Sequence, residues 1–149
     1  LATTADVAAA GKILQVVHAS YGTTTTNNTV TFADTGLTAT ITPSLTTSKI
    51  LVIVTQAGVA RGGGNANSAV SLRLLRDAGE ITKFENEVGY TATSLFLNTG
   101  TQGTVWLDSP ATTSATIYKT QFKSTLAGIQ QAVNQNNVNS SIVLMEVSA

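Results

Sequence analysis

Apolar and polar residues alternate with a period of two along most of this 149-residue chain, and the alternation predicts β-strands separated by turns. The clearest case is the segment 115–123, where Thr, Tyr and Phe share one face while Lys, Gln and one Ile share the other. The preceding Asp108-Ser-Pro110 predicts a corner, because proline donates no hydrogen bond and keeps the residue before it extended. The stretch 104–123 is therefore expected to form a strand, a turn and a second strand.

The same pattern predicts short strands, and no long helix, in the rest of the chain. The segments expected to be strands are 12–19, 29–33, 37–42, 50–54, 70–74, 81–84, 91–97, 104–107, 115–123 and 140–147. Asp34-Thr-Gly36 and Asn98-Thr-Gly100 are expected turns, Asp77-Ala-Gly79 is expected to close a hairpin, and 126–133 is either a short strand or a loop. Strands of this number and spacing predict an all-β fold, a two-sheet antiparallel jelly-roll-like sandwich of about ten strands.

Some of these strands carry apolar residues on both faces, which a single sandwich does not require, because each of its strands should keep one face in water. They are the segments 13–17, 50–54 and 142–147 and, in part, the strand around Tyr118. If these strands lie in one sheet, the simplest cover for its outer face is another copy of the same chain. The residues assigned to that interface or to the core are Ile13, Val17, Ile50, Val52, Tyr118, Phe122, Ile142 and Leu144.

Charge and cysteine content exclude several classes of function. Charged residues make up 11% of the chain and the formal net charge is +0, so no surface for nucleic acid or for an anionic membrane is expected. The absence of cysteine excludes disulfides, cysteine-based zinc sites and thiol catalysis. No apolar run approaches the roughly 18 residues of a membrane-spanning helix, so no membrane insertion is expected. Residues 1–11 are interpreted as a linker or the end of an upstream segment, and residues 12–149 as a single β-sandwich domain.

The side chains that could carry chemistry are few and scattered. His18 is the only histidine and shares a face with Leu14 and Val16, so a buried or interface position is expected rather than a catalytic one. One histidine and dispersed carboxylates predict no metal site, and no cofactor is expected. Glu85 and Glu87 are interpreted as solvated charges or a subunit ion pair rather than a hydrolytic pair. We therefore expect no catalytic residue and no enzymatic activity.

Sugar binding is the alternative that the aromatic residues leave open, because lectin-like sites combine an aromatic face with nearby amides and carboxylates. Trp106 stands beside Val105 and Leu107 and is expected in the core. The segment 61–67 is expected to be a flexible, exposed loop, because its three successive glycines lose much backbone entropy on ordering. The residues predicted as possible ligand contacts, all placed in loops, are Tyr21, Arg61, Asn65, Asn67 and Tyr90.

Five segments carry a resemblance to a known family. They are Gly11–Val17, Gly36–Pro43, Ser48–Val52, Asp108–Lys119 and Ser141–Val147, and they sample nearly the whole chain. Together they resemble a β-domain that recurs in tail-fibre and other virion structural proteins of tailed bacteriophages. The resemblance implies a homotrimeric jelly-roll-like module on a virion appendage or capsid surface, facing the exterior, with other virion proteins as partners. The expected function is structural, and a receptor-binding tip that recognises a host cell-surface glycan is the alternative.

Overall fold

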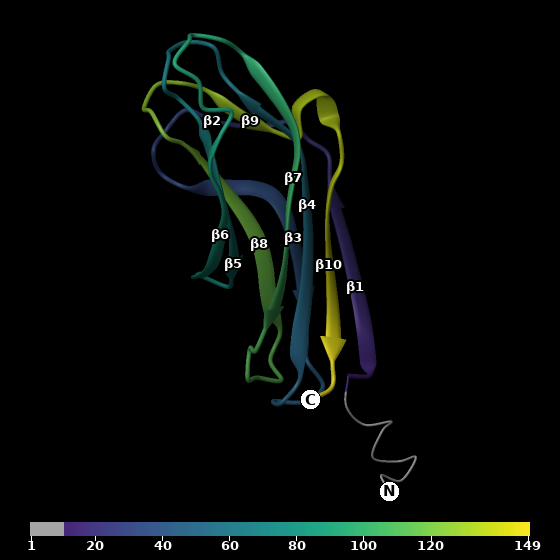
Figure 1. Ribbon diagram of the computed structural model, residues 1–149. Helices are drawn as coiled ribbons and strands as arrows, with labels where there is room; N and C mark the ends of the chain where they lie inside the picture. The colour runs from purple at the N-terminus through teal and green to yellow at the C-terminus, as the bar shows by residue number, and fades with distance from the viewer. Residues whose placement is uncertain (1–10) are drawn as a thin grey trace, which may run out of the picture.

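Two antiparallel sheets packed face to face make up the computed structural model, which describes residues 11–149 (Figure 1). The elements in chain order are β1 (Ile13–Tyr21), β2 (Thr25–Asn27), β3 (Ala33–Ile41), β4 (Lys49–Arg61), β5 (Val70–Arg76), β6 (Gly79–Val88), β7 (Leu97–Asp108), β8 (Thr116–Ser124), β9 (Gln131–Val133), the 3₁₀ turn η1 (Gln135–Asn137) and β10 (Ser140–Val147). The first sheet has the order β1-β10-β4-β9-β2, with β7 also paired to β4, and the second has the order β3-β8-β5-β6. Because β10 and β7 pair with the same stretch of β4, they lie on its opposite sides. The two-sheet all-β sandwich expected from the sequence is confirmed.

The pairing of the long strands defines a jelly roll. β1 pairs with β10, β3 with β8, β4 with β7, and β5 with β6, in each case antiparallel. The first half of the chain thus pairs with the second half as one long hairpin, and successive pairs alternate between the two sheets, which is the winding of a jelly roll. The jelly-roll-like topology expected from the sequence is confirmed. Apart from Gly11, the expected linker 1–11 lies outside the described residues.

The core lies between the sheets and is filled by the inward residues of both. Every second residue of β8 is buried, beginning with Thr116, while the residues between them are half-buried or exposed, so the alternation predicted for 115–123 is confirmed. Burial of one aliphatic or aromatic side chain stabilises a fold by about 1.5–3 kcal/mol. The buried residues of the main cluster are Leu37, Ala39, Ile41, Ile50, Val52, Val54, Leu74, Tyr118, Ile142 and Leu144.

A buried network of polar side chains also joins the two sheets. Gln56 of β4 donates hydrogen bonds of 2.9 Å to Ser140 Oγ and 3.1 Å to Asn134 Oδ1. Its own Oε1 accepts a hydrogen bond of 2.8 Å from Thr120 of β8, and Thr120 shares another of 2.6 Å with Thr35 of β3. A shift of one sheet against the other would leave these buried groups without partners, so the network fixes how the sheets sit together.

The region around β3 differs from the prediction. Most of the predicted strand 29–33 is a bend instead, because Asn27 Oδ1 accepts a hydrogen bond of 2.8 Å from the backbone N of Thr29. The predicted turn Asp34-Thr-Gly36 is also wrong, since these residues lie within β3. Gly36 has a φ of 93°, and the register of β3 against β8 shifts at this point. The glycine therefore forms a bulge and does not end the strand.

The approach to β7 is a second departure. Residues 91–96 of the predicted strand 91–97 form a loop, and the predicted turn Asn98-Thr-Gly100 lies inside β7. Gly100, with a φ of 82°, lies where the register of β7 against β4 shifts, so it again forms a bulge within a strand.

Other boundaries agree with the sequence. The hairpin predicted at Asp77-Ala-Gly79 is confirmed by the pairing of β5 with β6. The corner predicted at Asp108-Ser-Pro110 is confirmed by the end of β7 at Asp108. The ambiguous segment 126–133 contains both predicted alternatives, a loop followed by the short strand β9.

Candidate assembly surface

The outer face of the first sheet carries rows of apolar side chains that cross four strands. Paired residues of neighbouring strands point to the same face of a sheet, so the register defines each row. The first row runs from β1 through β10 and β4 to β7 and consists of Val16, Met145, Leu51 and Leu107. The second row, one pleat away, consists of His18, Val143, Ile53 and Val105. Neither row contains a charged residue other than the titratable His18.

Within the described part of the chain, no element covers these rows. Val16 is 56% exposed, Leu107 54% and Val105 62%, whereas the residues of the two central strands are half-buried by their neighbours. An apolar surface that spans four strands of a folded domain is typical of an interaction site. His18 is predicted to be buried or at an interface. Its side chain is exposed on this face, so the buried alternative is wrong and the interface position stays a prediction.

Most residues predicted for the interface or core lie in the core. Six of them are fully buried between the sheets: Ile50, Val52, Tyr118, Phe122, Ile142 and Leu144. Val17 is half-buried against the same core, and Ile13 is 53% exposed at the start of β1. The outer residues of the same strands were missed, because a strand that is apolar on both faces gives no sequence signal for which face turns inward.

β7 is exposed along its free edge as well as on its outer face. The prediction that Trp106 lies in the core is wrong, since 41% of this residue is exposed. It points to the inner side of the sheet, but β7 is the last strand on its side of β4, and no described residue covers this side chain completely. Val105, Trp106 and Leu107 are therefore three consecutive exposed apolar residues on one edge strand.

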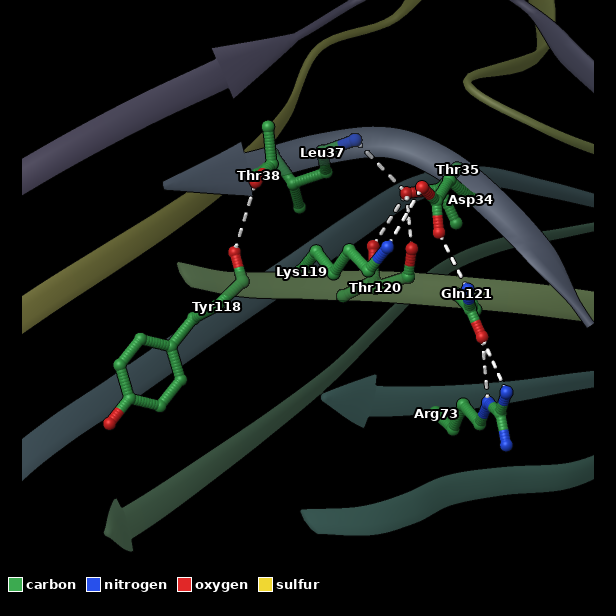
Figure 2. A network of polar contacts seen from close by, with 9 residues as sticks. All are labelled: Asp34, Thr35, Leu37, Thr38, Arg73, Tyr118, Lys119, Thr120 and Gln121. Carbon is green, nitrogen blue, oxygen red and sulfur yellow. Dashed lines mark hydrogen bonds and ion pairs between the residues drawn. The ribbon is translucent and has the colours of Figure 1, made fainter. Parts of the chain in front are cut away.

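The outer face of the second sheet is built differently. Asp34 binds Lys119 Nζ at 3.0 Å and accepts a hydrogen bond of 2.6 Å from Gln121 Nε2 (Figure 2). Arg73 donates to Gln121 Oε1 at 2.9 and 2.6 Å, as Figure 2 also shows, and pairs with Glu80 at 2.9 Å. Partial burial alone would raise the pKa of Asp34, but the hydrogen bonds from Gln121 and Lys119 outweigh it and hold that pKa below its usual value. The polar groups of these four side chains thus bind one another across the outer face of the second sheet.

A second cluster forms around Arg61, where the structure corrects the prediction of a flexible loop. Arg61 is the last residue of β4 and is fully buried. Its guanidinium has no carboxylate partner among residues 11–149 and donates to four backbone carbonyls, those of Asn65, Ser68 (2.8 Å), Thr93 (3.2 Å) and Leu95. One buried cation thus holds the segments 62–68 and 91–96 together, which explains why 91–96 does not form the predicted strand.

The glycines of this segment serve close packing rather than mobility. A Cβ atom at Gly62 would collide with the carbonyl oxygen of Gln130, and one at Gly63 would lie 2.8 Å from the backbone N of Phe96. The segment therefore lies packed between two other loops, at the end of the sandwich remote from the C-terminus (Figure 1).

The predicted ligand contacts are only partly brought together. Tyr90 and Asn67 meet in this cluster, where the Tyr90 hydroxyl donates to Asn67 Oδ1 at 3.0 Å, and Asn65 is exposed nearby in the same loop. Arg61 is buried beneath them and cannot contact a ligand. Tyr21 is not in a loop, since it ends β1 and packs against the core, and its ring lies against Gly36.

One buried carboxylate lies at the opposite end of the first sheet. Glu146 of β10 accepts hydrogen bonds from Gln15 Nε2 (2.6 Å), Ser44 N (2.7 Å) and Ser44 Oγ (3.0 Å). Burial alone would raise the pKa of Glu146, but the hydrogen bonds from Gln15 and Ser44 lower it to about 2. The carboxylate has no basic partner among its hydrogen bonds and ties the corner after β3 to β10.

Neither a metal site nor a membrane span is found in residues 11–149. No three His, Cys, Asp or Glu side chains in this range are grouped so that they could hold a metal ion. The same residues include no helix with the length and hydropathy required to cross a bilayer.

Comparison with known proteins finds no matching family model and no matching curated protein. Among solved structures, the chain is similar to the VP2 subviral particle of infectious bursal disease virus, with a TM-score of 0.48 and 14% identity over 90% of this chain and 32% of that one. It is also similar to the structure of the Gx strain of the same virus, with a TM-score of 0.38 and 13% identity over 94% of this chain and 33% of that one. The chain thus spans about a third of the length of these solved chains. Likenesses this distant carry no information about function.

Proposed function

We propose that this chain is a non-enzymatic structural protein of a virus particle, whose jelly roll assembles as a homotrimer through the outer face of the first sheet. The observation that carries the proposal is the pair of apolar rows across β1, β10, β4 and β7, which nothing in the described residues covers. Three of the strands predicted to be apolar on both faces, β1, β10 and β4, lie side by side in this sheet. Covering such a face with a second copy removes its apolar side chains from water.

The place of the domain in the particle is proposed on the sequence resemblance. A tail fibre or a decoration on the capsid surface of a bacteriophage, exposed to the exterior and in contact with other virion proteins, agrees with a neutral surface rich in Thr, Ser, Asn and Gln. The proposal includes no catalytic residue, metal or cofactor, because the sequence has one histidine, no cysteine and carboxylates that are scattered along it.

The trimer is tested by light scattering after size exclusion. The wild-type chain is expected at three times the 15.3 kDa mass of one copy. Val105→Asp should be monomeric and folded, because the residue is 62% exposed in the single chain but would bury an unpaired charge in the trimer. The matched control is Ile117→Asp, which changes a 43% exposed residue on the other sheet and should leave the trimer intact. A wild-type monomer at micromolar concentration would contradict the proposal.

A receptor-binding tip is the alternative function, and the cluster held by Arg61 is the observation that favours it. The segments 62–67, 89–99 and 125–130 contain no charged residue, and they present the 53% exposed Tyr90 beside Asn67. An aromatic ring with amides and hydroxyls around it suits a neutral sugar. Loops fixed in advance by a buried cation lose little entropy on binding.

Binding of host cell-surface glycans to an immobilised array tests this alternative. Tyr90→Ala should abolish any binding, whereas Val30→Ala, a change at a 50% exposed residue of another loop, should leave it unchanged. If the wild-type trimer binds no glycan, the structural role alone stands.

A further inference from the structure

The edge strands of the two sheets differ in their protection. An open strand edge invites pairing with another chain, and proteins that remain separate place charged residues on it. β6, at one edge of the second sheet, carries Glu80, Lys83, Glu85 and Glu87. β1 carries no acidic or basic residue apart from His18, and β7 carries only Asp108, which is paired with Arg76 at 2.8 Å. β1 and β7 are therefore long unprotected edges of the first sheet, whose remaining end strand is the three-residue β2.

These two edges lie on opposite sides of the uncovered apolar face. β1 pairs only with β10, and the long part of β7 pairs only with β4, so each leaves one side of its backbone without a ladder in the described residues. β1 presents Leu14 and Val16, and β7 presents Val105, Trp106 and Leu107. The two strands run antiparallel to each other, because three antiparallel pairings separate them.

We infer that the copies of this chain join edge to edge, with β7 of one copy against β1 of the next. The inference rests on the proposed trimer and specifies its contact. A ring of three cannot use a twofold contact, in which a patch meets itself; it requires two different patches that fit each other. One repeated contact between β7 and β1 closes the ring, because each copy meets one neighbour through its β7 edge and the other neighbour through its β1 edge.

The register of the sheet predicts which residues meet. Val16 and Leu107 stand at the two ends of one row, so they are at the same height along the strands. Copies related by rotation about an axis along the strands keep that height, and Leu107 of one copy then faces Val16 of the next. Trp106, on the inner side of the same edge, becomes covered by the neighbouring copy.

Disulfide trapping tests this contact, because the natural chain has no cysteine. Val16→Cys and Leu107→Cys variants, given tags of different length and produced together, should form a mixed disulfide dimer on mild oxidation. Neither variant alone should form one, and a chain with both changes should yield covalent trimers. The control pair, Thr40→Cys with Lys83→Cys, lies on β3 and β6 of the other sheet and should not cross-link.

The outcomes separate the contact from the trimer itself. A trimer in which Val16→Cys or Leu107→Cys cross-links with itself, or in which the mixed pair fails to cross-link, overturns the edge contact while the trimer stands. A monomer in light scattering overturns both.

Trp106 supplies a second readout, because it is the only tryptophan in the chain. Dilution below the dissociation constant should shift its emission to longer wavelength while the far-UV circular dichroism stays constant. Trp106→Ala should raise the dissociation constant by about tenfold or more, since buried tryptophans are frequent hot spots of interfaces. Emission that does not change on dissociation contradicts the inference.

Discussion

The outer faces of the two sheets differ in polarity. On the second sheet, Asp34, Lys119, Gln121 and Arg73 bind one another and leave a polar surface to the water. On the first sheet, most side chains at the equivalent outer positions are apolar, and no part of residues 11–149 covers them. Both sheets contribute side chains to the core between them, but only the first presents an apolar outer face. We propose that a second copy covers this face, whereas the polar face of the second sheet stays in water.

Arg61 of the first sheet is buried, whereas Arg73 of the second sheet is partly exposed. We expect the replacement of Arg61 to have the largest effect on stability. Arg61→Ala leaves four carbonyls of two loops without their donor and should lower the free energy of unfolding by about 3 kcal/mol or more. Arg73→Ala, on the outer face of the second sheet, removes a partly exposed ion pair and should cost about 1 kcal/mol or less. Urea unfolding of both variants measures the difference, and equal losses would contradict it.

Apolar substitutions on the outer face of the second sheet should make it associate as well. Lys119→Leu together with Lys123→Leu places two apolar residues beside the exposed Ile117 on the second sheet. We expect the doubly changed trimer to associate further, so that species larger than a trimer appear in light scattering. Lys119→Gln with Lys123→Gln is the matched control, because it removes the same charges without adding apolar surface. Larger species in the control would show that charge alone keeps the second sheet free.

Acid distinguishes the carboxylates of the two sheets. The pKa of Glu146 is about 2 in the folded chain and 4.5 in its ordinary state, so its contribution to stability is present above pH 4.5 and is lost as the pH falls towards 2. Thermal unfolding followed over this window should show the loss, and Glu146→Gln should be less stable at neutral pH and less sensitive to acid. Asp34 also has a lowered pKa, but it is more exposed, and Asp34→Asn should change the profile less. An unchanged acid profile in Glu146→Gln would refute this assignment.

The sequence predicts strand faces where polar and apolar residues alternate, and it predicts corners where a proline ends a strand. The faces of β8, the hairpin of β5 and β6, and the corner after Asp108 follow from such signals. The sequence does not predict which face of β4 and β10 turns towards the core, because both faces of these strands are apolar. For this reason the sequence assigns residues such as Ile50 to the interface or the core without separating the two, and it does not single out Val105 and Leu107.

The Arg61 cluster lies beyond sequence reasoning for a different reason. Glycine-rich segments are usually mobile. The sequence around Arg61 does not indicate that its guanidinium is buried or that it binds carbonyls more than 30 residues away. The sequence likewise predicts turns at Gly36 and Gly100, where the structure has bulges. A local pattern does not show that strand pairing continues on both sides of a glycine.

The pairing of β1 with β10 has a consequence for synthesis. Ile13 pairs with Val147, so β1 has no neighbour in its sheet until the residues up to the end of β10 have left the ribosome. At the usual 5–20 residues per second, that interval is on the order of ten seconds. A chain that stops before Ser140 lacks the strand that positions β1, and with it the edge through which copies are proposed to join. We therefore expect chains that end before β10 to be left out of the proposed ring, because they cannot present an ordered β1 edge.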